Sequence, residues 1–248
     1  MDPGPGRLTM EILGAGIAWL LDPAHWSGSN GIPTRLLEHV ALSGASLLVA
    51  AFVAVPVGLH TGHTGRWGAT VLNVANIGRA VPSYALLLVF FTLTGALGAP
   101  TTLPTLVLLA IPPLLAGVHV AIREVDRDVI EAGRGMGMRE LQVLRRVELP
   151  AGMPLILVGA RTAAVQVVAT ATLGALVAGG GLGRYIVDGF ALRGAEGTAR
   201  LVAGAILVAA LAIATERAFS LVERRALPPG FAPGSLPRET ARRAGFGM

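Results

Sequence analysis

One polar stretch of the chain, residues 131–150, has residue types and spacing that could support a specific function. It reads EAGRGMGMRELQVLRRVELP and contains four arginines. Long apolar segments flank it on both sides, so it must form a substantial aqueous loop between membrane-grade helices. Two small residues, Ala132 and Gly133, would let the backbone of a partner come close. The stretch therefore predicts a docking surface for another protein.

Two glycines divide this loop into two expected helices. Gly135 and Gly137, on either side of Met136, can take positive φ at little cost, so helices over 129–134 and 138–146 should meet there at an angle. Three apolar residues fall on one face of the second helix and should pack back on the membrane helices: Leu141, Leu144 and Val147. Four arginines would remain for solvent or for a partner: Arg134, Arg139, Arg145 and Arg146.

The elements that hold this loop must be membrane helices, because the composition is that of a membrane protein. Of 248 residues, 53% are hydrophobic and 14% are charged, whereas about a quarter of a soluble domain is charged. We expect an all-α membrane bundle of about five to six transmembrane helices. Five apolar segments are predicted to span: 40–59, 80–97, 103–122, 153–177 and 201–221. Pro112-Pro113 should bend the third of them.

Composition also divides the chain into three regions. Residues 1–35 are rich in glycine and proline; their apolar run, 12–21, is too short to span and is expected to lie at the interface, with Trp19 and Trp26 near the headgroups. A tail rich in proline, glycine and arginine is expected to be disordered. The tail covers residues 226–248, and the transmembrane domain covers 36–225. Within that domain, the loop is 123–150, and 60–79 is a mixed segment expected in water or at the interface.

Several function classes are disfavoured by residues that the chain lacks. All 20 basic residues are arginine, and a standard phosphate-binding loop needs a lysine, so any ATP and Mg²⁺ would bind to a partner. Cysteine is absent. His60 and His63 have no third ligand nearby in the sequence, so we expect no metal site. The net charge of +5 is modest and scattered near the ends of the apolar segments, which argues against a nucleic-acid surface. We expect neither catalytic residues nor a cofactor of its own in this chain.

The distribution of arginine predicts how the chain is oriented. If the 123–150 loop is placed inside, fourteen arginines lie on its side, in 60–79, in the loop and from residue 201 onward. Five lie on the opposite side. Because positive charge is enriched in cytoplasmic segments, we expect the loop and the C-terminus in the cytoplasm of a multi-pass protein of the cell membrane.

A second candidate site is a stripe of polar residues on the fourth span. Thr162, Gln166 and Thr170 recur every four residues and share one helix face. They could line a wet path between two membrane subunits, or they could form hydrogen bonds between helices. Ser83, after Pro82, could lie beside the path at a kink, although Pro82-Ser83 more simply marks a helix start. Arg161, the one embedded charge, is expected to extend to the cytoplasmic boundary.

The 131–150 stretch resembles the "EAA" loop of ATP-binding-cassette (ABC) importer permeases. That loop begins with an acid and two small residues, has glycine at its seventh position and ends with Leu-Pro; here these positions are Glu131, Ala132, Gly133, Gly137, Leu149 and Pro150. Other segments resemble the osmoprotectant branch of these permeases, for glycine betaine, choline, carnitine and proline: 131–138, 147–150, 159–163, 171–173 and 179–183. The chain departs from the pattern at Gly133, at Gln166 and at Arg79.

The resemblance implies a fold, partners and a mechanism. The fold would be that of a type I importer permease, and the loop would seat in a groove of a cytoplasmic ABC ATPase and transmit its closure. A second permease, identical or related, and an external substrate-binding protein would complete the assembly in the lipid bilayer. Two alternatives remain: a permease for another small solute, such as an amino acid, and a stand-alone secondary transporter or channel. The second is disfavoured, because we find no internal repeat and only Arg161 is embedded.

Overall fold

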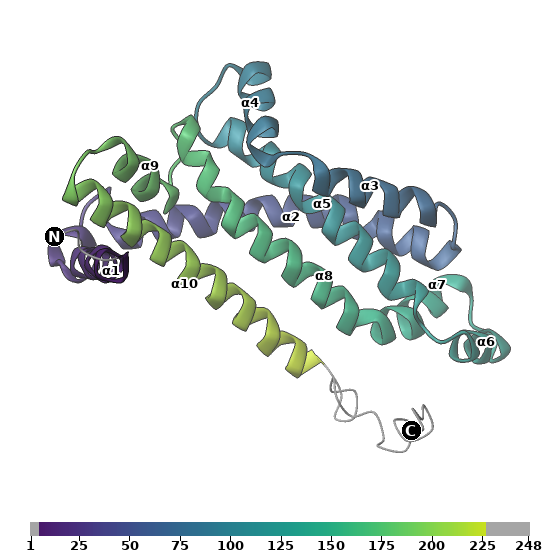
Figure 1. Ribbon diagram of the computed structural model, residues 1–248. Helices are drawn as coiled ribbons and strands as arrows, with labels where there is room; N and C mark the ends of the chain where they lie inside the picture. Colours follow the sequence, from purple (N-terminus) through teal and green to yellow (C-terminus); the bar gives the residue numbers. More distant parts are fainter. Residues whose placement is uncertain (1–4, 227–248) are drawn as a thin grey trace, which may run out of the picture.

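The computed structural model describes residues 5–226, and every regular element in that range is a helix. Four helices form an elongated bundle, α2 (Ile32–Thr64), α5 (Ala99–Arg123), α8 (Leu149–Thr170) and α10 (Ala195–Ala226) (Figure 1). Four helical runs are long and apolar enough to cross a membrane, or five if the bent pair α3–α4 counts as one span. The predicted all-α membrane architecture is thus confirmed.

Helix α5 is the centre of this bundle. Within its most apolar stretch, 67% of the residues are buried, against 22% to 28% for the other three long runs. It packs against α2, α8, α3 and α4. Pro112-Pro113 lie inside α5 without ending it. The remaining spans keep broad apolar faces, including those of Leu48 and Phe52 at 74% and 83% exposure, as expected for surfaces that meet lipid or further membrane subunits.

Glycine lets the helices around α5 approach closely. Gly58 and Gly62 lie one turn apart on α2, where an added Cβ would overlap Val118 and Ile122 of α5. On the other side, a Cβ on Gly117 would lie 2.8 Å from the Cα of Gly159 in α8. Small residues at such crossings are typical of membrane helices, whose association depends on backbone proximity rather than on the hydrophobic effect.

The second predicted span, 80–97, is wrong in its boundaries. The structure instead has α3 (Gly68–Ala80) and α4 (Ser83–Thr94), joined at an angle of 87°. Val71 and Ala75 of α3 are buried along α5, so most of the 60–79 segment belongs to the bundle and not to water. Pro82 caps α4, and a helix of 12 residues rises only about 18 Å.

Smaller differences concern where helices begin and end. Helix α2 extends beyond the predicted 40–59 at both ends, and α5 starts at Ala99, before the predicted 103–122. The region between the predicted fourth and fifth spans contains a further helix, α9 (Gly183–Ala191). A 3-10 segment, η3 (Ala171–Val177), ends the fourth span. These shifts reflect tertiary packing, which extends helices beyond their apolar cores.

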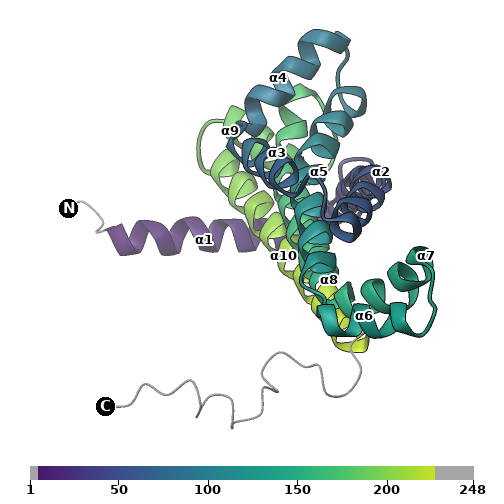
Figure 2. The same cartoon turned by 90° about the vertical axis from the view of Figure 1, so that its right-hand side faces the viewer.

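The N-terminal apolar run forms a longer helix than expected, α1 (Pro5–Leu21), followed by the short 3-10 helix η1 (Pro23–Trp26). Helix α1 packs on α10 and runs across the bundle rather than along it (Figure 2). Trp19 stacks on His25 and meets the edge of Tyr185 at 5.2 Å, and Trp26 is half exposed. The location of α1 at a membrane interface remains a prediction. The expected disorder of the tail concerns residues 227–248, which lie outside the described residues.

Candidate functional site

The predicted bend of the docking loop is confirmed. Helix α6 (Arg127–Gly135) starts at Asp126, whose carboxylate accepts a hydrogen bond from the N–H of Asp128 at 2.9 Å. It ends at Met136, and Gly137 then takes a φ of 80° while its N–H donates to the Arg134 carbonyl. A left-handed residue just after a helix redirects the chain. The positive φ at position 137 is the conformation that favours glycine there.

The second helix of the loop is continuous with the membrane helix. Helix α7 (Glu140–Val143) runs into a π-helical turn, η2 (Leu144–Glu148), and then into α8 without a break. The sequence predicted a separate helix over 138–146. The structure shows instead that α7, η2 and α8 form one continuous helical run.

The π-helical turn also overturns the predicted apolar face of this helix. Val143 and Glu148 are the buried residues, whereas Leu141 is 56% exposed. A π turn adds a residue to one helical turn, so the i, i+3, i+6 pattern of Leu141, Leu144 and Val147 does not stay on one face. Leu141 therefore joins the accessible surface of the loop.

The six residues that match the EAA pattern gather in and beside this loop. Glu131 and Ala132 are exposed on α6, and Leu149 and Pro150 begin α8. Gly133 is buried, because it faces Val147 and Met138 of its own chain. The expectation that Gly133 admits a partner's backbone is therefore wrong. A Cβ there would lie 3.4 Å from Val147, so alanine would fit with little adjustment.

An ion network that the sequence did not predict joins the loop to α2. The Arg134 guanidinium donates two hydrogen bonds to Glu140, at 3.1 and 2.9 Å, and this contact raises the pKa of Arg134. Nδ1 of His63 lies 2.6 Å from Glu148, and its Nε2 lies 3.2 Å from Glu140. His60 and His63 thus lie in the last turns of α2 and not in a loop. No sequence pattern signals a contact between residues 85 positions apart.

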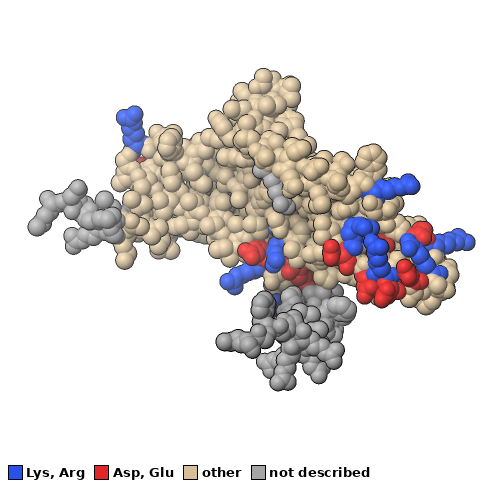
Figure 3. Space-filling view, turned by 45° about the vertical axis from the view of Figure 1, so that its right-hand side comes forward, with Lys and Arg blue, Asp and Glu red and all other residues tan. Residues whose placement is uncertain are grey.

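A charged cavity lies beneath this network. It has a volume of about 230 Å³ and is lined by His63, Arg123, Arg127, Ile130, Glu131, Arg134 and Glu148. Charged side chains also gather at this end of the molecule and near the end of α10, while most of the visible surface is uncharged (Figure 3). Arg139, Arg145 and Arg146 are exposed, as the sequence predicted. The loop therefore presents a charged surface, and the contacts of Arg134, Glu140, His63 and Glu148 hold its helices together.

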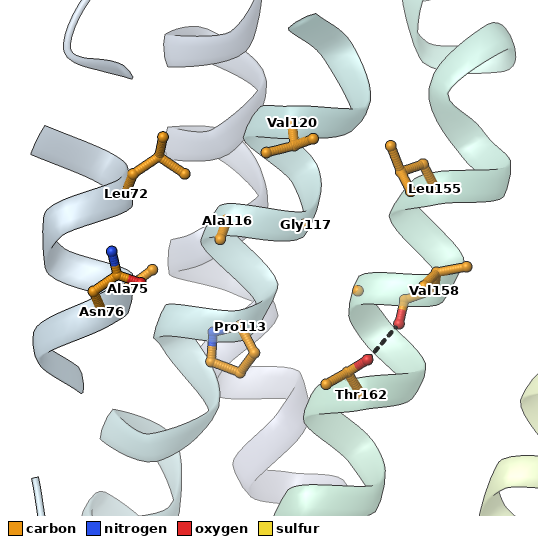
Figure 4. A pocket seen from close by; sticks show the side chains of 11 residues that line it. Leu72, Ala75, Asn76, Pro113, Ala116, Gly117, Val120, Leu155, Val158 and Thr162 are labelled. Carbon is orange, nitrogen blue, oxygen red and sulfur yellow. Dashed lines mark hydrogen bonds between the residues drawn. The ribbon is translucent and has the colours of Figure 1, made fainter. Parts of the chain in front are cut away.

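Two of the four candidate path residues line a common cavity. Thr162 and Gln166 border a cavity of about 410 Å³ with Arg161, Val165 and Glu216. Thr162 also borders a second, mostly apolar cavity of about 290 Å³ between α3, α5 and α8 (Figure 4). Its hydroxyl donates to the Val158 carbonyl at 3.0 Å. A role in a wet path is compatible with this geometry and stays a prediction.

The other two candidate path residues are placed differently. Thr170 ends α8 and donates its hydroxyl to the Gln166 carbonyl at 2.7 Å. Ser83 is the first residue of α4, as the helix-start interpretation predicted, and it lines neither cavity. Arg161 pairs with Glu223 near the end of α10 at 3.5 Å, a partner that the sequence did not indicate.

Solved structures with a similar arrangement define the class of protein. The chain superposes on the inward-facing MetNI methionine ABC transporter with a TM-score of 0.69 and 23% identity, covering 79% of this chain and 96% of that one. An amino acid ABC transporter solved with histidines gives a TM-score of 0.62 at 16% identity, covering 78% and 93%. The fold is that of type I ABC importer permeases.

Sequence comparison identifies the family within that class. Residues 48–228 match the family described as "Binding-protein-dependent transport system inner membrane component", and the chain belongs to it. The carnitine transport permease protein OpuCD of Listeria monocytogenes is 36% identical over 209 residues, 84% of this chain and 92% of the relative. The choline transport system permease protein OpuBB of Bacillus subtilis is 33% identical over 196 residues, 79% and 88%. The chain is therefore a multi-pass membrane component of a transport system.

Proposed function

We propose that this chain is the membrane subunit of an ATP-driven importer for a compatible solute that carries a quaternary ammonium group, such as glycine betaine, choline or carnitine, or for proline. The solute class is inferred from the names of the relatives, which state what those proteins transport. Besides the carnitine and choline permeases, a glycine betaine/carnitine/choline permease of Bacillus subtilis is 34% identical over 82% of this chain.

The geometry of the docking loop supports an ATPase as the source of energy. The loop exposes Glu131, Ala132 and a set of arginines, and its second helix continues into α8. A partner that closes on α6 and α7 would therefore move a membrane helix directly. Two permeases would rock around a central path as two ATPase subunits open and close. ATP and Mg²⁺ would bind in those subunits, and the loop and the C-terminus would lie in the cytoplasm.

Solute selection would lie mainly in an external binding protein. Quaternary ammonium groups are recognised by cages of aromatic rings, and only 5% of this chain is aromatic. The family description, a binding-protein-dependent system, supports such a receptor. A permease for an amino acid of another kind is the alternative, since the solved structures of similar fold include a methionine transporter.

The solute is tested by binding to the cognate receptor. Glycine betaine, choline, carnitine, proline and methionine are titrated against the purified receptor, and each solute that binds is then tested for ATP-dependent uptake by the reconstituted complex. We expect at least one quaternary amine or proline to bind and to be taken up. Binding of methionine alone would reject the solute class while leaving the ATP-driven mechanism intact.

The docking role is tested at Gly137. Gly137→Asp puts a side chain and a negative charge on a residue with a φ of 80°, so we expect it to abolish uptake and to weaken co-purification of the ATPase, with normal insertion in the membrane. Gly135→Ala is the matched control, because Gly135 lies in α6 and nothing lies within 4 Å of an added Cβ. Normal uptake by Gly137→Asp would reject the docking role.

A further inference from the structure

Glu148 is the charged residue that links the docking loop to a second membrane helix. Its side chain is 3% exposed, and one oxygen lies 2.6 Å from Nδ1 of His63, whose side chain is 14% exposed. A carboxylate only accepts hydrogen bonds, so Nδ1 must donate its proton. A carboxylate buried to this degree is costly without a partner. The contact therefore fixes the end of α2 against the π-helical turn.

A second, more exposed contact extends this link to the rest of the loop. Nε2 of His63 faces Glu140 of α7 at 3.2 Å, and Glu140 is held in turn by Arg134 of α6. Both ring nitrogens of His63 therefore face carboxylates, and both donate when the ring carries two protons. Arg134 and Glu140 are 47% and 61% exposed, so solvent weakens their interaction. The buried Glu148 contact is the stronger link.

The two membrane helices involved differ in how they connect to the loop. Helix α8 is covalently continuous with α7 and η2. Helix α2 ends at Thr64 and is 75 or more residues away from α7 along the chain, so only noncovalent contacts can transmit a movement of the loop to it. Besides the packing of α2 on α5 and α8, the contacts of His63 with Glu148 and with Glu140 are the direct connections between α2 and the loop that the described residues show.

We propose that Glu148 and His63 are positioning residues that make α2 and α8 move together when the ATPase acts on the loop. The inference rests on the proposed ATPase docking. When the pair is broken, the ATPase would still bind and hydrolyse ATP, but part of each stroke would move α8 without α2. Less solute would then be carried per ATP.

The experiment measures the ratio of solute transported to ATP hydrolysed, in proteoliposomes that contain the full complex and the receptor. Glu148→Met removes the acceptor while filling a similar volume, and Glu148→Gln keeps an acceptor oxygen. We expect Glu148→Met to lower the ratio about fivefold or more, which corresponds to a modest coupling energy between sites, and Glu148→Gln to retain most of it. Glu124→Gln, an exposed carboxylate at the end of α5, is the control for charge.

The outcomes separate this inference from the proposed function. If the parent chain binds no ATPase, the docking proposal fails and the ratio has no meaning. If Glu148→Met retains the ATPase and uptake falls only in proportion to ATP hydrolysis, the positioning role is overturned, because a general loss of folded complex gives that result.

A double-variant cycle adds a test that does not depend on one substitution. His63→Phe keeps a ring but cannot donate to the carboxylate. If the two residues act as a pair, adding His63→Phe to Glu148→Met lowers the ratio no further. Independent, multiplying losses would overturn the pairing. Should Glu148→Met give no intact complex, His63→Phe alone decides between a lowered and an unchanged ratio.

Discussion

The two ends of α2 each carry a histidine that contacts the α8 region, and the two contacts differ in kind. His39, 1% exposed, donates from Nε2 to the Val168 carbonyl at 2.9 Å and accepts at Nδ1 from the N–H of Leu182 at 3.3 Å. Both partners are backbone groups. At the other end, the partners of His63 are two carboxylate side chains.

This difference indicates that one contact is fixed and the other can change. We call the His39 contact the fixed joint and the His63 contact the adjustable joint. Backbone groups cannot leave His39 unless the chain moves, whereas carboxylates can rotate away from His63. Glycine tightens the fixed joint. Gly181 donates its N–H to Glu38 at 2.8 Å, and an added Cβ on Gly180 would overlap Glu38. The loop for which we propose a coupling role lies at the adjustable end, where contacts can change while the fold persists.

The largest expected effect is the loss of the fixed joint. His39→Ala removes a buried ring and leaves a carbonyl and an N–H without their partner, which should cost about 3 kcal/mol of stability. His63→Ala should cost less, about 2 kcal/mol, because the ring is 14% exposed and water that enters can solvate Glu148 in its place. Thermal unfolding of the purified complex compares the two, with the exposed His60→Ala as control. Equal losses for His39→Ala and His63→Ala would remove the distinction between the joints.

A smaller effect is expected from the left-handed glycine at each end. Gly181 and Gly137 have φ values of 85° and 80°, so alanine should cost about 1–2 kcal/mol at either. At Gly181 the new Cβ would also lie 3.0 Å from Nδ1 of His39, whereas nothing lies within 4 Å at Gly137. Unfolding should therefore show a larger loss for Gly181→Ala. A larger loss for Gly137→Ala would mean that the loop is the more tightly packed end.

The smallest effect on stability is expected on α8 between the two joints. The parent has no cysteine, so Thr162→Cys, Gln166→Cys and Thr170→Cys can each be tested with a small water-soluble thiol reagent. We expect labelling that varies with the nucleotide state if this face is wet. The neighbouring Ala163→Cys, at a fully buried position, should stay unlabelled. If none of the three polar positions reacts in any nucleotide state, a wet path along this face is excluded.

The sequence predicted the loop well because its signals are local. Of the two glycines that flank Met136, Gly137 takes the positive φ expected at the bend, whereas Gly135 stays within α6. The apolar face failed for a reason that periodicity cannot detect. A π-helical turn at Leu144–Glu148 changes the register, which leaves Leu141 exposed and buries Glu148.

The segment 60–97 was predicted poorly because its polar residues were taken as a sign of water. Asn76 instead borders a cavity between α3, α5 and α8 and is exposed there. A cavity between helices can hold polar groups that lipid cannot. Hydropathy measures transfer from water to an apolar phase and cannot tell the two environments apart.

By itself, the sequence indicated the class of protein: hydropathy predicts an all-α membrane protein, the missing lysine disfavours a standard phosphate-binding loop, and the spacing from Glu131 to Pro150 resembles that of a transport subunit. These features depend on composition and on neighbours along the chain. Only the tertiary structure decided which residues meet across it, such as His39 with Leu182 and His63 with Glu148. Contacts between distant residues depend on how helices cross and rotate, and the packing of whole helices sets that geometry.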